Sequence, residues 1–140
     1  KIGFEVTETS VIRDPESANS VGSGDIDLPG LSKRVFSTTL YYTLGGFEAR
    51  VSQRRRSDYI GEIGNFDGNR TLRYVVGEDI TDAQVSYAFP ATSAFGGLTV
   101  LLQGLNLTNE SYRTYAGTKD RPLEHIEWGR TYLVGVNYRF

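Results

Sequence analysis

The end of the chain alternates between apolar and small or polar side chains, and this alternation limits the possible folds more than any other feature. The apolar set is Tyr132, Val134, Val136, Tyr138 and Phe140, and the set between them is Leu133, Gly135, Asn137 and Arg139. Side chains two residues apart share one face of a strand, and no helix would gather that apolar set on one side. The pattern therefore predicts a strand with one apolar face, as in an outer-membrane barrel or in a sandwich of two packed sheets.

Five earlier segments alternate in the same way. With the last one, the predicted strands are residues 1–7, 34–44, 47–57, 78–89, 98–109 and 127–140. Sixteen glycines, nine tyrosines and seven phenylalanines against four prolines are a composition of strands and turns. The sequence therefore predicts an all-β chain of antiparallel, up-and-down strands.

The connections between these six strands alternate in length. Residues 8–33, 58–77 and 110–126 are rich in polar and turn-forming residues and are predicted to be long loops, whereas residues 45–46 and 90–97 are short connections. Outer-membrane barrels have short turns at the periplasmic end and long loops outside. A soluble sandwich has no reason to sort its connections in this way, so the alternation favours the barrel.

Aromatic residues form two groups along the predicted strands. The group expected at the periplasmic rim is Phe47, Tyr87, Phe89, Tyr138 and Phe140, and the group expected at the outer rim is Tyr112, Trp128 and Tyr132. Transmembrane barrels carry an aromatic girdle at each interface. Strands are rich in Tyr and Phe in any case, so the grouping supports the barrel without requiring it.

Six strands cannot close a barrel by themselves. Each free edge of a membrane-spanning strand leaves roughly ten backbone groups unpaired, and each such group costs several kcal/mol in hydrocarbon. The total exceeds the ~5–15 kcal/mol stability of a whole domain, and the smallest single-chain barrels have about 8 strands. The 140 residues are therefore expected to be one part of a larger barrel domain.

Composition excludes several other classes. The chain has no cysteine, which rules out a disulfide framework and cysteine-based metal or redox chemistry. A net charge of −2 argues against a general nucleic-acid binder. Arg54, Arg55 and Arg56 do not form a basic patch, because alternation sends Arg54 and Arg56 to the lumen and Arg55 to the outside, where lipopolysaccharide phosphates could meet it.

Several motifs together resemble the C-terminal barrel segment of the TonB-dependent outer-membrane receptors. They lie at residues 28–33, 46–52, 56–58, 82–87, 105–109, 129–132 and 138–140. The most specific are Asn106-Leu-Thr-Asn109 and the ending that starts with Gly129-Arg-Thr-Tyr132. The match runs from about residue 28 to the end and looks closest to the proteobacterial branch associated with sugar uptake.

This resemblance implies a 22-stranded barrel closed by an N-terminal plug and energised by the TonB complex. The chain contains neither the plug nor a TonB box, so it is expected to be a C-terminal fragment that cannot transport alone. Gly135, Tyr138 and Phe140 match the signal read by the outer-membrane assembly machinery, whereas Leu133 stands where a polar residue is usual. The implied partners are the bilayer, lipopolysaccharide, the plug, TonB and a small-molecule ligand. The implied location is the Gram-negative outer membrane.

No catalytic motif is present, and an enzyme is not expected. His125, between Glu124 and Glu127, lacks enough neighbouring ligands for a metal site, and no cofactor is expected. Ligand contacts are expected in the outer loops, at Tyr59, Asn65, Phe66, Asp67, Asn69, Arg70, Tyr112, Arg113, Tyr115, Asp120 and Arg121, where aromatic rings and polar groups suit a sugar. The lumen-facing Arg50, Gln84, Gln103, Asn137 and Arg139 are further candidates for the ligand or the plug.

The expected function is energy-coupled uptake of a scarce nutrient, a saccharide before a siderophore or cobalamin. The alternative from another class is a soluble β-sandwich that binds carbohydrate.

Overall fold

The computed structural model describes residues 1–10, 29–66 and 69–139. Within these ranges every regular element is a β-strand and every pairing is antiparallel, which confirms the predicted all-β class. None of the described residues belongs to a helix able to cross a membrane.

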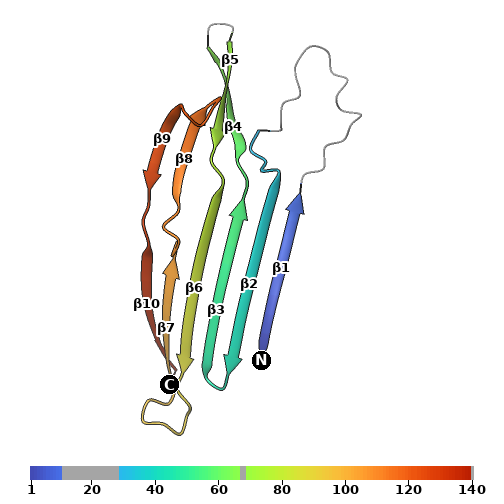
Figure 1. The fold of residues 1–140 in the computed structure, drawn as a ribbon. Coiled ribbons are helices and arrows are strands. Elements are labelled where there is room, and N and C mark those ends of the chain that lie inside the picture. The colour runs from blue at the N-terminus through green and yellow to red at the C-terminus, as the bar shows by residue number, and fades with distance from the viewer. Residues whose placement is uncertain (11–28, 67–68, 140) are drawn as a thin grey trace.

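The strands form two sheets (Figure 1). The six-stranded sheet contains, side by side, β1 (Ile2–Ser10), β2 (Arg34–Leu44), β3 (Phe47–Arg56), β6 (Glu78–Ala88), β7 (Leu98–Leu105) and β10 (Thr131–Tyr138). The four-stranded sheet contains β4 (Tyr59–Phe66), β5 (Asn69–Val75), β8 (Ser111–Ala116) and β9 (Pro122–Glu127). The smaller sheet continues the larger one, because β4, β5, β8 and β9 follow or precede β3, β6, β7 and β10 within a few residues and keep their order.

The six predicted strands agree closely with the strands of the larger sheet. The predictions of long loops at residues 58–77 and 110–126 are wrong, because these segments hold the paired strands β4–β5 and β8–β9. Polar composition suggested loops there. A hairpin exposed to water needs its backbone ladder but no continuous apolar face, so its sequence lacks a strong alternating signal. Most of the predicted first loop, residues 11–28, lies outside the described residues.

The segments that connect the strands of the larger sheet lie at its two ends. The turn at residues 45–46 and the connection at residues 89–97 lie at one end of the larger sheet, with Lys1 and the β10 C-terminus. The β4–β5 and β8–β9 hairpins extend from the opposite end (Figure 1). The sheet therefore has a compact end and an extended end.

The two-residue turn at the compact end depends on glycine. Gly45 has φ 58°, which residues with a Cβ rarely adopt. At Gly46, an added Cβ would lie 2.0 Å from the carbonyl oxygen of Ala88. The Ala88 amide donates a 2.8 Å hydrogen bond to the Gly46 carbonyl oxygen, so the close approach of these two backbones also holds β3 against β6.

Strand register places the apolar side chains of the larger sheet on one face. Cross-strand partners include Phe4 with Leu40, Leu40 with Val51, and Leu102 with Val134. Many of these side chains are strongly exposed, Phe4 at 76% and Val134 at 74%. Among the described residues the buried hydrophobic side chains are Ile60, Val75 and Tyr115, all in the smaller sheet. The larger sheet thus presents an apolar face that no described residue covers.

The opposite face is polar. One cross-strand row runs from Tyr41 through Arg50 and Gln84 to Gln103. Asn137 lies on this face too, since it pairs with Thr99 and Thr99 pairs with Ala88. Four of the predicted lumen-facing residues therefore share one face of the sheet, opposite Val134 and its apolar neighbours.

The aromatic groups lie near the two ends of the larger sheet. At the compact end, Phe47 pairs with Tyr87, whose ring centroid is 4.9 Å from that of Phe89. At the extended end, the Tyr112 and Trp128 ring centroids are 5.9 Å apart. Phe140, which belongs to the first group, lies outside the described residues.

The edges of the larger sheet are β1 and β10. No described residue pairs with the outer side of either strand, so each edge carries unpaired backbone groups.

Candidate functional site

The junction between the two sheets brings together side chains from distant parts of the sequence. Four short links cross it, at residues 57–58, 76–77, 106–110 and 128–130. Backbone pairing continues through the links, since the Val76 amide donates to the Arg113 carbonyl oxygen at 2.9 Å. These links hold the smaller sheet in register with the larger one, as its continuation beyond the extended end.

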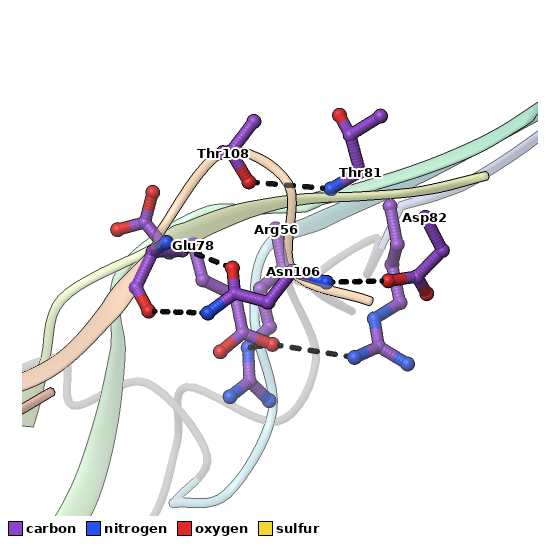
Figure 2. Close-up of polar contacts among 8 residues, drawn as sticks. Arg56, Glu78, Thr81, Asp82, Asn106 and Thr108 are labelled. Carbon is purple, nitrogen blue, oxygen red and sulfur yellow. Dashed lines mark hydrogen bonds and ion pairs between the residues drawn. The ribbon is translucent and has the colours of Figure 1, made fainter. Parts of the chain in front are cut away.

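Asn106 is the central clasp of this junction (Figure 2). Its backbone amide donates to Asp82 Oδ1 at 2.9 Å, and its side-chain Nδ2 donates to the carbonyl oxygens of Glu110 and Gly129, each at 3.0 Å. The Glu110 amide donates to Asn106 Oδ1 at 2.8 Å. Asn106 therefore ties three neighbouring strands together, and its φ of 53° explains why β7 ends at Leu105 rather than at the predicted residue 109.

The rest of the Asn106-Leu-Thr-Asn109 motif strengthens the clasp. The Leu107 amide donates to the Thr81 carbonyl oxygen at 2.8 Å, and the Thr81 amide donates to Thr108 Oγ1 at 3.3 Å (Figure 2). From the β9–β10 link, Arg130 Nε donates to the Leu107 carbonyl oxygen at 2.9 Å. The motif that carried the family resemblance thus has a structural role in this chain.

Beside the clasp lies a cleft of about 990 Å³, here called the junction cleft, which both sheets line. Its aromatic lining is Phe36, Tyr59, Tyr74 and Tyr115. Its charged lining consists of five basic residues, Lys33, Arg34, Arg55, Arg56 and Arg113, and five acidic residues, Glu8, Asp58, Glu78, Asp79 and Glu110. The volume lies at the upper end of the roughly 300–1,000 Å³ range of small-molecule sites.

Asp58 is the most highly connected carboxylate of the cleft. Oδ1 accepts a hydrogen bond from the Gly77 amide at 2.7 Å, and Oδ2 lies 2.9 Å from Lys119 Nζ and accepts from the Tyr115 hydroxyl at 3.3 Å. Burial raises the pKa of Asp58, but the Gly77 hydrogen bond, with Lys119 and Tyr115, outweighs burial and holds the pKa below its usual range. Asp58 is therefore an ionised anchor that joins β3–β4, β5–β6 and the β8–β9 hairpin.

Two tyrosines form a stacked pair in the cleft. The Tyr74 and Tyr115 rings are 5.1 Å apart between centroids and inclined by 10°. Tyr115 is buried, and burial, followed by the nearby Asp58 carboxylate, raises the pKa of its hydroxyl. Tyr74 is only half-buried. Tyr115 therefore covers one face of the Tyr74 ring.

Two ion pairs position further polar groups of the cleft. Arg56 Nε lies 3.1 Å from Glu78 Oε1, and the Arg56 guanidinium carbon lies 4.9 Å from the centre of the Tyr59 ring. Arg113 Nη2 lies 3.6 Å from Glu110 Oε1. These pairs hold planar guanidinium and carboxylate groups around the aromatic lining.

Of the ligand residues predicted from sequence, the cleft brings together Tyr59, Arg113 and Tyr115. Tyr112 packs instead on Trp128, and neither Asp120 nor Arg121, in the β8–β9 turn, lines the cleft. Asn65 pairs with Arg70 and Phe66 with Asn69 at the end of the β4–β5 hairpin, and Asp67 lies outside the described residues.

Sequence reasoning missed Asp58, Tyr74, Glu78 and Glu110 as cleft residues. Asp58 and Gly77 lie just outside the two ends of the β4–β5 hairpin and are joined by a hydrogen bond, and a carboxylate next to a glycine at these ends was the available signal.

His125 does not line the cleft, and its Nε2 lies 3.4 Å from Glu127 Oε1. Within the described ranges no three His, Cys, Asp or Glu side chains are grouped as a metal site would require.

Comparisons with models of protein families, with curated proteins and with solved structures found no match to this chain.

Proposed function

We propose that the chain forms part of a transmembrane β-barrel in a Gram-negative outer membrane. The observation that carries this proposal is the uncovered apolar face of the larger sheet, opposite a polar face. Burying an aliphatic or aromatic side chain is worth about 1.5–3 kcal/mol, and soluble proteins rarely leave a contiguous apolar surface of this extent exposed. Hydrocarbon would cover this face while water fills the lumen on the other side.

The length of the apolar face agrees with a membrane. On β2 it runs from Phe36 to Leu44, about 26 Å at ~3.3 Å per residue. The strand tilt of about 35–45° found in such barrels reduces this to about 20 Å along the membrane normal, close to their ~25 Å apolar band. The aromatic contacts near the two ends of the sheet fit the two interfacial girdles, with Tyr132 and Trp128 near the outer one.

The unpaired edges support a larger barrel. In hydrocarbon, the free sides of β1 and β10 would cost on the order of tens of kcal/mol. Additional strands on both sides would remove this cost, as in the 22-stranded TonB-dependent receptors that the sequence resembles. On this proposal Gly135, Tyr138 and Phe140 serve as the assembly signal, and the plug and the TonB complex act with the complete protein.

The proposed activity is energy-coupled nutrient uptake, with a saccharide favoured over a siderophore or cobalamin. The resemblance to the branch associated with sugar uptake supports this preference. In this scheme loss of the TonB complex would abolish uptake.

Spin labels placed on the two faces of β10 test the membrane assignment. Labels at Val134 and Val136 should be accessible to oxygen and shielded from a water-soluble nickel reagent in bilayers. Labels at Leu133 and Asn137, on the opposite face, should give the reverse result. If Val134 and Val136 prove to be packed in a protein core in a detergent-free monomer, the soluble carbohydrate-binding sandwich is correct instead.

A further inference from the structure

We infer that the larger-sheet wall of the junction cleft binds the phosphate of an outer-leaflet lipid, with Arg34 and Arg55 as the anion-binding groups. This inference rests on the proposed membrane barrel and goes further, because strand register adds Arg34 and Phe36 to the outward-facing Arg55 predicted from sequence. Three observations support it: the face on which these side chains lie, their depth in the membrane, and the partners of the other charged groups.

The wall lies on the membrane-facing side of the larger sheet. One cross-strand row runs from Glu8 through Phe36 and Arg55 to Asp79, and all four residues line the cleft. Leu40 lies on the same face of β2 as Phe36, and this is the apolar face proposed to meet hydrocarbon. A ligand of this wall therefore approaches from the lipid side of the barrel and not from the lumen.

The two arginines lie at the outer border of the apolar face. Arg34 lies two residues beyond Phe36 on β2, about 7 Å further along the strand, and the polar headgroup layer on each side of a bilayer is about 5–8 Å thick. The Ser57 amide donates to the Arg34 carbonyl oxygen at 3.0 Å, and Arg55 pairs with Phe36, so Arg34 and Arg55 are diagonal neighbours. Such neighbours are about 7–8 Å apart, which lets both guanidinium groups bind one phosphate.

Both arginines are available to an anion. Within residues 1–10, 29–66 and 69–139, neither guanidinium group forms an ion pair or a hydrogen bond. Three carboxylates of the cleft are instead paired with other basic residues: Asp58 with Lys119, Glu78 with Arg56, and Glu110 with Arg113.

The wall itself carries an excess of positive charge. Lys33, which directly precedes β2, lines the cleft with Arg34 and Arg55, and these three cations face two carboxylates, Glu8 and Asp79. The Asp79 carboxylate also accepts a 2.7 Å hydrogen bond from Gln53 Nε2. This balance favours an anionic group over a cationic one.

Phe36 gives the site an apolar part. Its side chain is 37% exposed and lies between Arg34 and the exposed Leu40 on one face of β2. The acyl chains of a lipid whose phosphate binds the arginines would lie along Phe36 and Leu40. A free phosphate ion would make only the polar contacts, so the site is expected to prefer a phosphorylated lipid to inorganic phosphate.

Lipid binding to the complete protein in detergent micelles, measured by native mass spectrometry, tests the inference. The probe is diphosphoryl lipid A, and the control lipid is the same molecule without its phosphates. The phosphorylated lipid should bind at least about tenfold more tightly, because only it can form charge-assisted hydrogen bonds with the arginines. Arg34→Gln and Arg55→Gln, made separately, should each weaken its binding about tenfold for the same reason.

Arg54→Gln is the matched control. It removes the same charge from the adjacent residue of β3, but Arg54 lies on the opposite face of the strand, so lipid binding should change less than about twofold. Inorganic phosphate, added in equimolar amount to lipid A, distinguishes a lipid site from a site for the free anion and should leave the lipid bound.

Several results would overturn the inference. They are absence of lipid A binding, equal binding of the lipid without phosphates, wild-type affinity in Arg34→Gln or Arg55→Gln, an equal loss in Arg54→Gln, and displacement of the lipid by inorganic phosphate. A heat-modifiability gel checks that each variant is folded, and the comparison of the two lipids needs no variant. A protein that passes the β10 spin-label test yet gives one of these results would retain the proposed barrel and lose only the lipid-phosphate site.

Discussion

Replacing Asn106 by alanine should lower the free energy of unfolding by about 4 kcal/mol. The Asn106 side chain takes part in three hydrogen bonds, two with Glu110 and one with Gly129, each worth about 1 kcal/mol. The left-handed backbone at φ 53° adds about 1 kcal/mol, because alanine tolerates this region less well than asparagine. This loss is a large share of the ~5–15 kcal/mol that is the typical free energy of unfolding of a domain.

Asn109 provides a matched control. It has a similar φ of 56°, but its side chain is exposed and forms no hydrogen bond to other described residues. Asn109→Ala should therefore cost only the backbone term, about 1 kcal/mol. Urea unfolding in detergent micelles, followed by tryptophan fluorescence, would measure both variants. Equal losses in the two variants would show that the side-chain hydrogen bonds of the clasp contribute nothing.

Three further predictions address the faces, the turn and the junction. Val134→Arg should cost about 2–4 kcal/mol and reduce assembly into membranes, whereas Leu133→Arg on the opposite face should be tolerated; equal assembly yields would contradict the lipid-facing assignment. Gly46→Ala should destabilise by about 2 kcal/mol because its Cβ would overlap the Ala88 carbonyl, while Gly45→Asn should cost under about 1 kcal/mol, both measured by urea unfolding. Because the pKa of Asp58 is lowered on folding, its stabilisation should be complete above the reference pKa of 3.8 and should be lost as the pH falls through the lower folded value. The protection factor of the Gly77 amide against hydrogen exchange should therefore fall in acid, and Asp58→Asn should remove that dependence; an unchanged protection factor in acid would refute the prediction.

The larger sheet could be predicted from sequence because its environment imposes a strict pattern. Where one face of a strand is apolar and the other polar, a shift of one residue would exchange the two faces, so the alternation in residues 34–44 and 47–56 defines both the strands and their orientation. The β4–β5 and β8–β9 hairpins are not under this constraint. Their backbone bonds need a partner strand but no apolar stripe, and their polar composition resembles that of loops.

The junction cleft was only partly predictable for a related reason. Tyr59, Arg113 and Tyr115 stood out as aromatic or charged residues between strands. Asp58 becomes a site residue only when strand register brings it to Tyr115, 57 positions away in the sequence. Tyr74 likewise gains its role from the ring of Tyr115. Local composition does not reveal that Asp58 and Tyr74 both lie beside Tyr115. These contacts follow only from the pairing of strands.

The unpaired sides of β1 and β10 also determine how this polypeptide would behave in isolation. Each side offers a ladder of amide and carbonyl groups to any strand of suitable length, and a second copy carries both. In dilute buffer, the β1 edge of one copy would pair with the β10 edge of the next, so that the sheets join side by side into ribbons. The apolar faces of these ribbons would then pack against one another. Fibrils that bind thioflavin are therefore the expected product of refolding the 140 residues without lipid.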